Sequence, residues 1–93
     1  MRVIAGSAKG RKLLSVPGDT TRPITDRVKE SLFNMLRGYV EGTTWLDLFA
    51  GTGAVGIEAL SQGAERVVFI DRVRKAIEVL RKNLETTGFT EQA

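Results

Sequence analysis

Apolar residues recur at helical spacing in the stretch that follows Thr25, a residue type suited to capping a helix N-terminus. The repeating positions are Val28, Leu32, Phe33, Met35, Leu36 and Tyr39. We expect this stripe to pack in the core. Gly38 and Gly42 bracket its end.

Residues 44–89 predict two strands that alternate with two helices. Short apolar runs indicate strands at 44–48 and 66–70, and helical spacing indicates helices at 54–62 and about 72–87. The last helix should present one apolar face, formed by Val73, Ile77, Leu80 and Leu84. Gly63 and Gly88 are natural helix stops, and Phe89 could make the apolar contact that accompanies a left-handed cap. The order strand–helix–strand–helix is the repeating unit of a parallel, doubly wound α/β sheet.

Residues 1–18 predict a basic β-hairpin extension that precedes residues 19–93. We expect short strands at 2–5 and 11–16, with a glycine at each end of the tip. A two-stranded ribbon is marginal in water, so it should pack on the rest of the chain or hold a partner. The turn-forming residues 17–21 mark the boundary.

Positive charge is concentrated near the N-terminus. The chain holds 14 Lys+Arg and 11 Asp+Glu, with a balance of +5 over residues 1–37 and −2 over residues 38–93. This asymmetry suggests contact with a polyanion, and a solvated basic face is the alternative. Lys9, Arg11 and Lys12 could contact phosphates near the hairpin tip. Arg22, on a stiff loop beside Pro23, is a candidate for fixed recognition, or else an ordinary surface charge.

The absence of Cys and His from the sequence excludes several kinds of catalytic and metal-binding site. Without Cys or His, the chain has no disulfide, no thiol nucleophile and none of the usual histidine sites. The longest apolar run, residues 67–70, is far shorter than the roughly 20 residues of a membrane span. A soluble, cytoplasmic chain without a metal is the expectation. Glu30 and Glu58 should lie on helices in solvent, so no residue in the chain stands out as a catalytic acid or base.

A glycine-rich turn between the first strand and helix of the alternating region is the most informative motif. In Asp47–Gly56, Gly51 and Gly53 allow a tight turn that a ligand can approach, and Gly56 lets the helix pack close to the sheet. Asp71 ends the next strand, 20 residues after Gly51. In a parallel unit its carboxylate should point into the same crevice and could accept hydrogen bonds from a ribose. The pattern predicts nucleotide binding, and a structural turn with a capping Asp is the alternative.

Asp47 bears on which nucleotide is bound. It lies near the carboxyl end of its strand, where it would repel the pyrophosphate of a dinucleotide. An acid there suits a cationic ligand such as S-adenosylmethionine, which carries an ammonium and a sulfonium group and no phosphate. Asp47 could also brace the turn by accepting backbone hydrogen bonds, and the two roles can coexist.

Three motifs together resemble the RsmD family, bacterial enzymes that methylate a guanine N2 amino group in 16S ribosomal RNA. They are residues 1–6 with Gly10-Arg11, residues 21–34 (TRPITDRVKESLFN), and the loop 47–56, which resembles the S-adenosylmethionine loop of Rossmann-like methyltransferases. The resemblance runs from Met1 essentially to the end of the chain. It implies the N-terminal half of a Rossmann-like methyltransferase fold, preceded by a basic hairpin and a helix.

The resemblance also implies the site. The cofactor residues would be Asp47, Phe49, Ala50, Gly51, Gly53, Asp71 and Arg72. Arg22 to Arg27 would border the pocket for the cofactor and target base, and the hairpin would grip 16S ribosomal RNA or an assembling small subunit. The RNA contacts would be Arg2, Lys9, Arg11, Lys12, Arg22 and Arg27.

The family's catalytic motif, Asn/Asp-Pro-Pro-Tyr/Phe, does not occur in this sequence, whose two prolines are Pro17 and Pro23. We therefore expect a fragment that ends before the catalytic strand, binds the cofactor weakly and transfers no methyl group alone. Two alternatives stay open: a non-catalytic RNA-binding module, and a fragment of an NAD(P)-dependent oxidoreductase.

Overall fold

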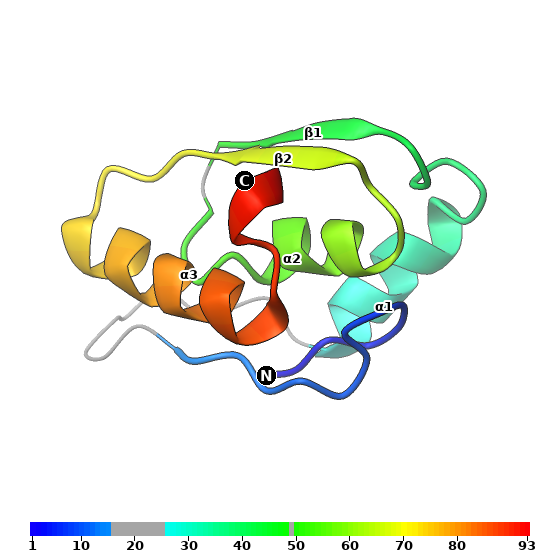
Figure 1. Ribbon diagram of the computed structural model, residues 1–93. Coiled ribbons are helices and arrows are strands. Elements are labelled where there is room, and N and C mark those ends of the chain that lie inside the picture. The colour runs from blue at the N-terminus through cyan, green and yellow to red at the C-terminus, as the bar shows by residue number, and fades with distance from the viewer. Residues whose placement is uncertain (16–25, 49) are drawn as a thin grey trace.

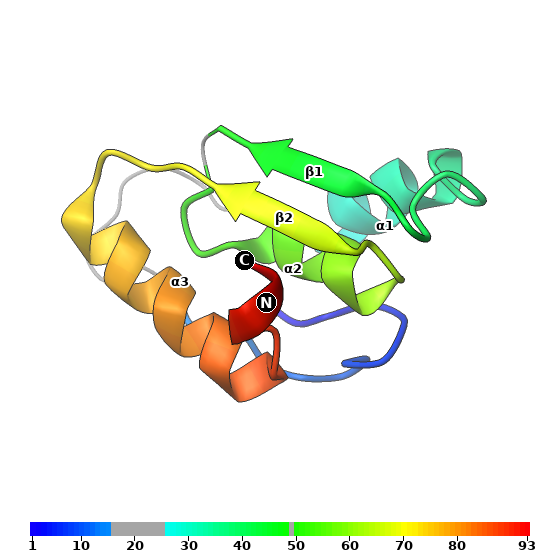
Figure 2. The same cartoon turned by 45° about the horizontal axis from the view of Figure 1, so that its top comes forward.

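A two-stranded parallel sheet lies at one side of the molecule. The computed structural model describes residues 1–15, 26–48 and 50–93. Strand β1 (Thr44–Asp47) pairs in parallel with β2 (Arg66–Phe69), with Thr44 opposite Arg66 and Asp47 opposite Phe69. The two arrows in Figure 2 point the same way. Because the strands are parallel, their carboxyl ends meet at one edge of the sheet.

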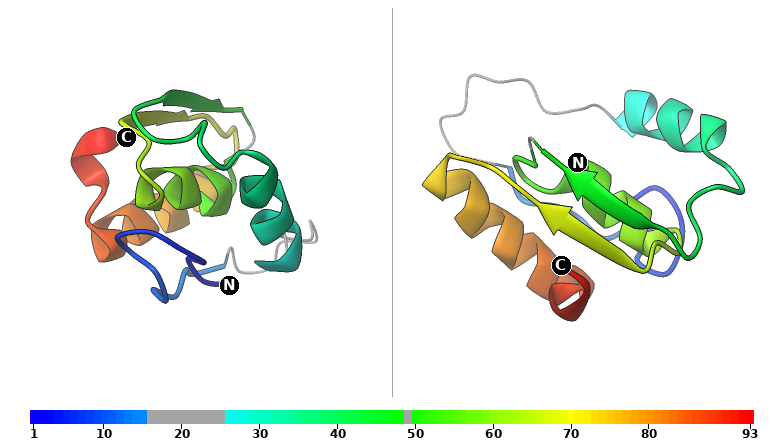
Figure 3. Two further views of the ribbon diagram at one scale, coloured as in Figure 1. Left: turned by 90° about the vertical axis from the view of Figure 1, so that its right-hand side faces the viewer. Right: turned by 90° about the horizontal axis from the view of Figure 1, so that it is seen from above.

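The described helices all lie on the same side of this sheet (Figures 1 and 3). They are α1 (Asp26–Met35), α2 (Ala54–Ser61), α3 (Arg74–Thr87) and the short 3₁₀ turn η1 (Thr90–Gln92). Helix α2 lies between the sheet and the N-terminal segment, residues 1–15. This position explains why nearly every residue of α2 is buried, including its polar ones.

Gly56 sets the close approach of α2 to the sheet. A Cβ atom at this position would lie 2.2 Å from the Phe69 ring and 2.9 Å from a methyl group of Val67. The role predicted for Gly56 is therefore confirmed.

The predicted alternation of strands and helices is confirmed, with ends that agree to within two residues. The cap of α3 is confirmed as well. Gly88 has φ 83° in the left-handed region, the Phe89 amide donates to the Leu84 carbonyl at 2.9 Å, and the Phe89 side chain is buried. Thr25, the expected cap of α1, and the predicted boundary near residue 18 lie outside the described residues.

The face that α1 turns toward the core differs from the prediction. Met35 and Tyr39 are 80% and 75% exposed, whereas Lys29 and Phe33 are buried. Phe33 belongs to the predicted stripe, and Leu32 and Leu36 also pack against the core, so the prediction is confirmed for these three residues. It is wrong for Val28, Met35 and Tyr39, which are exposed, and it missed Lys29. Two contacts fix the buried face: Phe33 stacks on Trp45 with ring centroids 5.6 Å apart, and Lys29 pairs with an acid of α2.

The N-terminal segment forms a hairpin-like loop without the two regular strands that were predicted. A single antiparallel bridge joins Arg2 and Lys12 within residues 1–15. The physical reason is that several backbone groups bond to side chains of the helices: the amides of Ile4 and Ala5, for example, donate to Glu58. The segment also packs on the rest of the chain, as expected, and buries three apolar side chains in the core: Val3, Ala8 and Leu13.

The face of the sheet that points away from the helices is open in the described part of the chain. Leu46 on β1 and Val68 on β2 are 59% and 45% exposed on this face. Their strand neighbours Trp45, Val67 and Phe69 instead contribute to the core beneath the sheet. Parallel sheets normally have both faces covered, and the described chain covers only one face of this sheet.

Candidate functional site at the carboxyl edge of the sheet

The glycine loop connects β1 to α2 and is bonded to the end of β2. The Ala50 amide donates to the Ile70 carbonyl at 3.1 Å, and the Gly53 amide donates to the Ala50 carbonyl at 2.8 Å. Gly53 has φ 85°, and a Cβ atom there would lie 2.2 Å from a Leu80 methyl group. Apart from its two chain neighbours, no described residue has an atom within 4 Å of a Cβ atom placed on Gly51. Gly53 therefore fits against the core, while the described residues leave space open at the backbone of Gly51.

Asp71 holds the loop in this position. One carboxylate oxygen accepts from the Gly51 amide at 2.9 Å, and the other accepts from the Val73 amide at 2.9 Å, just before α3 begins. The acid 20 residues after the glycine thus contacts it directly. A carboxylate offers about four lone-pair positions, so two are available to further donors.

The structure brings most of the predicted cofactor residues together at this edge. Asp47, at the end of β1, is half-buried, and its carbonyl accepts from the Ile70 amide at 2.8 Å. Ala50 is buried beside it. Arg72 follows Asp71 and is exposed, bordering a shallow hollow with Arg74 and other residues of α3. Phe49 lies outside the described residues.

The predicted RNA contacts lie on a different part of the surface. Lys9, Arg11 and Lys12 are exposed on the N-terminal segment. Arg2 is exposed too and lies 3.8 Å from the Asp26 carboxylate at the start of α1. Arg27 is exposed in the first turn of α1. Arg22 is not among the described residues.

The expectation of a solvated Glu58 is wrong. Its side chain is fully buried and forms an ion pair with Lys29, also fully buried, with 3.2 Å between the charged atoms. The carboxylate further accepts from the amides of Ile4 at 2.8 Å and Ala5 at 3.1 Å. Lys29 donates to the Arg2 carbonyl at 2.7 Å. The pair fastens the start of the N-terminal segment to α1 and α2. Glu30, by contrast, is exposed, as expected.

Two further buried polar residues escaped the sequence analysis. Ser61 Oγ accepts from the Ala8 amide at 2.9 Å and donates to the Ala5 carbonyl at 2.6 Å. Asn83 bonds the backbone of Leu14 and Thr52. The available signal was a polar residue among apolar ones: Ser61 ends a helix of small and apolar residues, and Asn83 adjoins Leu80 and Leu84 on the apolar face of α3.

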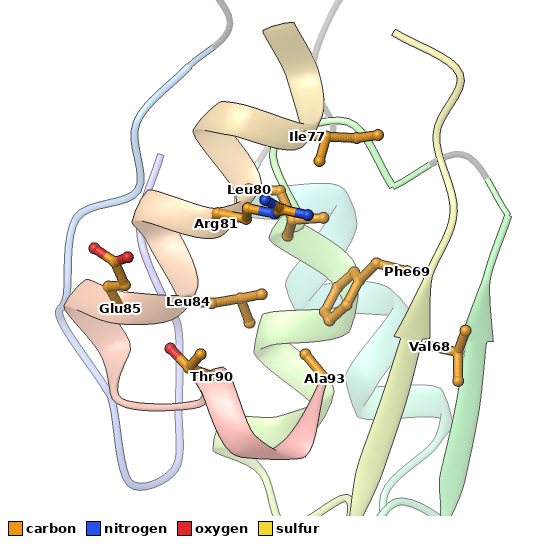
Figure 4. A pocket seen from close by; sticks show the side chains of 9 residues that line it. All are labelled: Val68, Phe69, Ile77, Leu80, Arg81, Leu84, Glu85, Thr90 and Ala93. Carbon is orange, nitrogen blue, oxygen red and sulfur yellow. The ribbon is translucent and has the colours of Figure 1, made fainter. Parts of the chain in front are cut away.

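An apolar groove of about 470 Å³ lies elsewhere, between β2, α3 and η1 (Figure 4). Its lining residues are Val68, Phe69, Ile77, Leu80, Arg81, Leu84, Glu85, Thr90 and Ala93. None of the described cofactor candidates lines it, so the groove is distinct from the glycine loop.

Within residues 1–15, 26–48 and 50–93, no cluster of acidic side chains has the arrangement that a metal ion needs. Among the described helices, none combines the length and the apolar character that crossing a bilayer requires.

Comparison with solved structures defines the class of this fold. A candidate methyltransferase, yhhF of Escherichia coli, superposes with a TM-score of 0.84 and 43% sequence identity, over 97% of this chain and 48% of that chain. The two parallel strands, their helices and the glycine loop are thus the N-terminal part of a Rossmann-like methyltransferase fold.

The family follows from the sequence comparisons. The model of the family described as "Conserved hypothetical protein 95" matches residues 1–93, and the chain belongs to this family, the RsmD family. YlbH of Bacillus subtilis, a candidate rRNA methyltransferase, is 56% identical over all 93 residues, which are 50% of its own length. Ribosomal RNA small subunit methyltransferase D of Haemophilus influenzae is 45% identical over 92% of this chain and 45% of its own length. The chain thus spans about half the length of these relatives.

Proposed function

We propose that the full-length protein carrying this chain is an S-adenosylmethionine-dependent methyltransferase that modifies a guanine N2 amino group in 16S ribosomal RNA, in the cytoplasm. Residues 1–93 would supply the cofactor loop and a basic RNA-contacting surface. The observation that carries the proposal is the bond between Asp71 and the Gly51 amide, which places a carboxylate beside an accessible glycine backbone at the carboxyl edge of parallel strands. Relatives named for rRNA methylation support the substrate.

The residues at this edge fit such a cofactor. Asp47 would attract its ammonium group, and the open backbone at Gly51 would line its methionine end. Asp71 retains acceptor positions for ribose hydroxyls. When bound, S-adenosylmethionine would supply an electrophilic methyl group for direct transfer to the guanine nitrogen. The part played by this chain would be binding and alignment, which need neither histidine nor cysteine.

The N-terminal segment would hold the RNA by its phosphates. Its exposed cations at Lys9, Arg11 and Lys12 form no ion pair with the described residues, so they are available to a polyanion. Such contacts position an RNA without reading its sequence. The target base would have to leave its stack to reach the cofactor.

Titration calorimetry on the full-length protein tests the cofactor part of the proposal. We expect S-adenosylhomocysteine to bind and NADH not to bind. Tight NADH binding with no response to S-adenosylhomocysteine would overturn the proposal and favour the oxidoreductase alternative.

A methylation assay with small-subunit RNA tests the substrate part. We expect incorporation of labelled methyl at a guanine N2 position, identified by nucleoside analysis. RNA binding that survives D71A, with neither cofactor binding nor methyl transfer by the unsubstituted protein, would instead indicate the RNA-binding module.

A further inference from the structure

Asn83 lies in the C-terminal half of α3 with no exposed surface, and both polar atoms of its side chain have hydrogen-bond partners. Its Oδ1 accepts from the Leu14 amide at 2.7 Å. Its Nδ2 donates to the Leu14 carbonyl at 3.1 Å and to the Thr52 carbonyl at 2.9 Å. One side chain therefore satisfies three backbone groups that belong to two separate segments.

These two segments belong to different parts of the proposed function. Thr52 lies between the two glycines of the cofactor loop, and its carbonyl is fixed by Asn83 from the core side. Leu14 lies two residues after Lys12 on the N-terminal segment, whose exposed cations face solvent. The Leu14 amide donates to Asn83 and the Leu14 carbonyl accepts from it. A residue in a neighbouring antiparallel strand would make the same pair of bonds.

Packing alone does not call for an asparagine at this position. Asn has a lower helix propensity than the apolar residues around it, and a polar group buried in a core is costly unless it is fully bonded. Here the bonding is complete: every buried side-chain polar atom in the described part of the chain has a partner. What Asn83 provides that an apolar residue would not is a fixed relation between Thr52 and Leu14.

We propose that Asn83 is a positioning residue that holds the cofactor loop and the RNA-contacting segment in one geometry. A substitution at this single site should therefore raise KM for both substrates, S-adenosylmethionine and RNA. The inference rests on the proposed function. Ser61 offers the contrast, because its side chain bonds the N-terminal segment at Ala5 and Ala8, so its loss should loosen the RNA side alone.

Steady-state kinetics on the full-length enzyme test this inference. N83D keeps the size of the side chain and removes both donors, so we expect KM to rise about fivefold or more for S-adenosylmethionine and for RNA. S61A should raise KM for RNA and leave KM for S-adenosylmethionine within about twofold. N34D makes the same chemical change on the exposed face of α1 and should alter neither.

The outcomes separate the inference from the proposed function. If the unsubstituted enzyme neither binds S-adenosylmethionine nor methylates RNA, the proposed function fails. If that enzyme is active and N83D alters KM for only one substrate or for neither, the inference is overturned. A purely structural role would lower the folded fraction, and with it kcat, and would leave both KM values unchanged.

A measurement without any substitution covers the case in which N83D does not fold. Hydrogen exchange of the unsubstituted enzyme should show that saturating S-adenosylhomocysteine slows the exchange of the Leu14 amide, which bonds Asn83, as well as that of the loop amides. Slower exchange in the loop with no change at Leu14 would overturn the inference.

Discussion

Lys29 and Glu58 form a buried ion pair that also bonds three backbone groups of the N-terminal segment. Removing one partner leaves the other charge buried without compensation, which typically costs about 3–5 kcal/mol. We therefore expect K29M to lower the free energy of unfolding of the full-length protein by that amount, measured by urea denaturation.

The matched control is K75M, which removes an exposed lysine from α3 and should change the free energy of unfolding by no more than about 0.5 kcal/mol. Equal effects of the two substitutions would contradict the role given to the buried pair.

Gly51 permits a second test at the scale of one residue. G51A adds a methyl group where no described residue, apart from the two chain neighbours, has an atom within 4 Å, at a φ of 54°, so the fold should lose only about 1 kcal/mol. The methyl group would occupy the space through which the cofactor approaches. We expect the Kd for S-adenosylhomocysteine to rise at least about tenfold, measured by calorimetry.

Gly38 provides the control for this change. It also has a positive φ, 88°, and no described residue beyond its chain neighbours has an atom within 4 Å of the added carbon, but it lies in the turns after α1. G38A should match G51A in stability and leave the Kd unchanged. A similar Kd for both variants would argue against a cofactor at Gly51.

Among the elements, those whose residues interact locally were predictable from the sequence. Gly88 and Phe89 identified the end of α3, and the position of Asp71 after Gly51 identified the edge where the two residues meet and where the candidate site lies. What periodicity could not reveal was pairing between distant residues. Lys29 has the composition of a surface position and is buried only because Glu58, from another helix, faces it.

The N-terminal segment shows the same limit. The sequence indicated two short strands, and some backbone groups do bond across the loop, as the Val3 amide does to the Arg11 carbonyl. Several others bond instead to side chains of α2 and α3, more than 50 positions away in the sequence. No local pattern encodes such partners, so the sequence predicted that the segment could pack on the rest of the chain but did not identify the residues that hold it.

The charges of this segment can be tested as a unit. Replacing Lys9, Arg11 and Lys12 with Gln should weaken RNA binding and make its dependence on salt shallower, by about 0.7 in slope for each lost contact with single-stranded RNA. Filter-binding titrations at several salt concentrations would measure both effects.

A control with the same loss of charge replaces the exposed Arg66, Lys75 and Lys82. If the control reduces the salt slope as much as the first variant does, the effect is one of net charge, and the N-terminal segment has no special role.

At the scale of the whole molecule, the described chain has a candidate cofactor edge, a basic N-terminal segment and one uncovered sheet face. It contains no residue that we assign to the methyl-transfer step. We expect residues 1–93 alone to transfer no methyl group to small-subunit RNA in an assay with labelled S-adenosylmethionine, under conditions in which the full-length protein is active. Transfer by residues 1–93 at a comparable rate would contradict this expectation.

The distant attachments of the N-terminal segment have a consequence for biosynthesis. Ile4 and Ala8 bond residues of α2 that lie 54 and 53 positions later, and the partner of Leu14 lies 69 positions later. During translation this segment leaves the ribosome before α2 and α3 do, so it cannot dock until both helices have been synthesised. Its residues therefore reach their native positions late, and until then a basic segment is exposed beside the nascent chain.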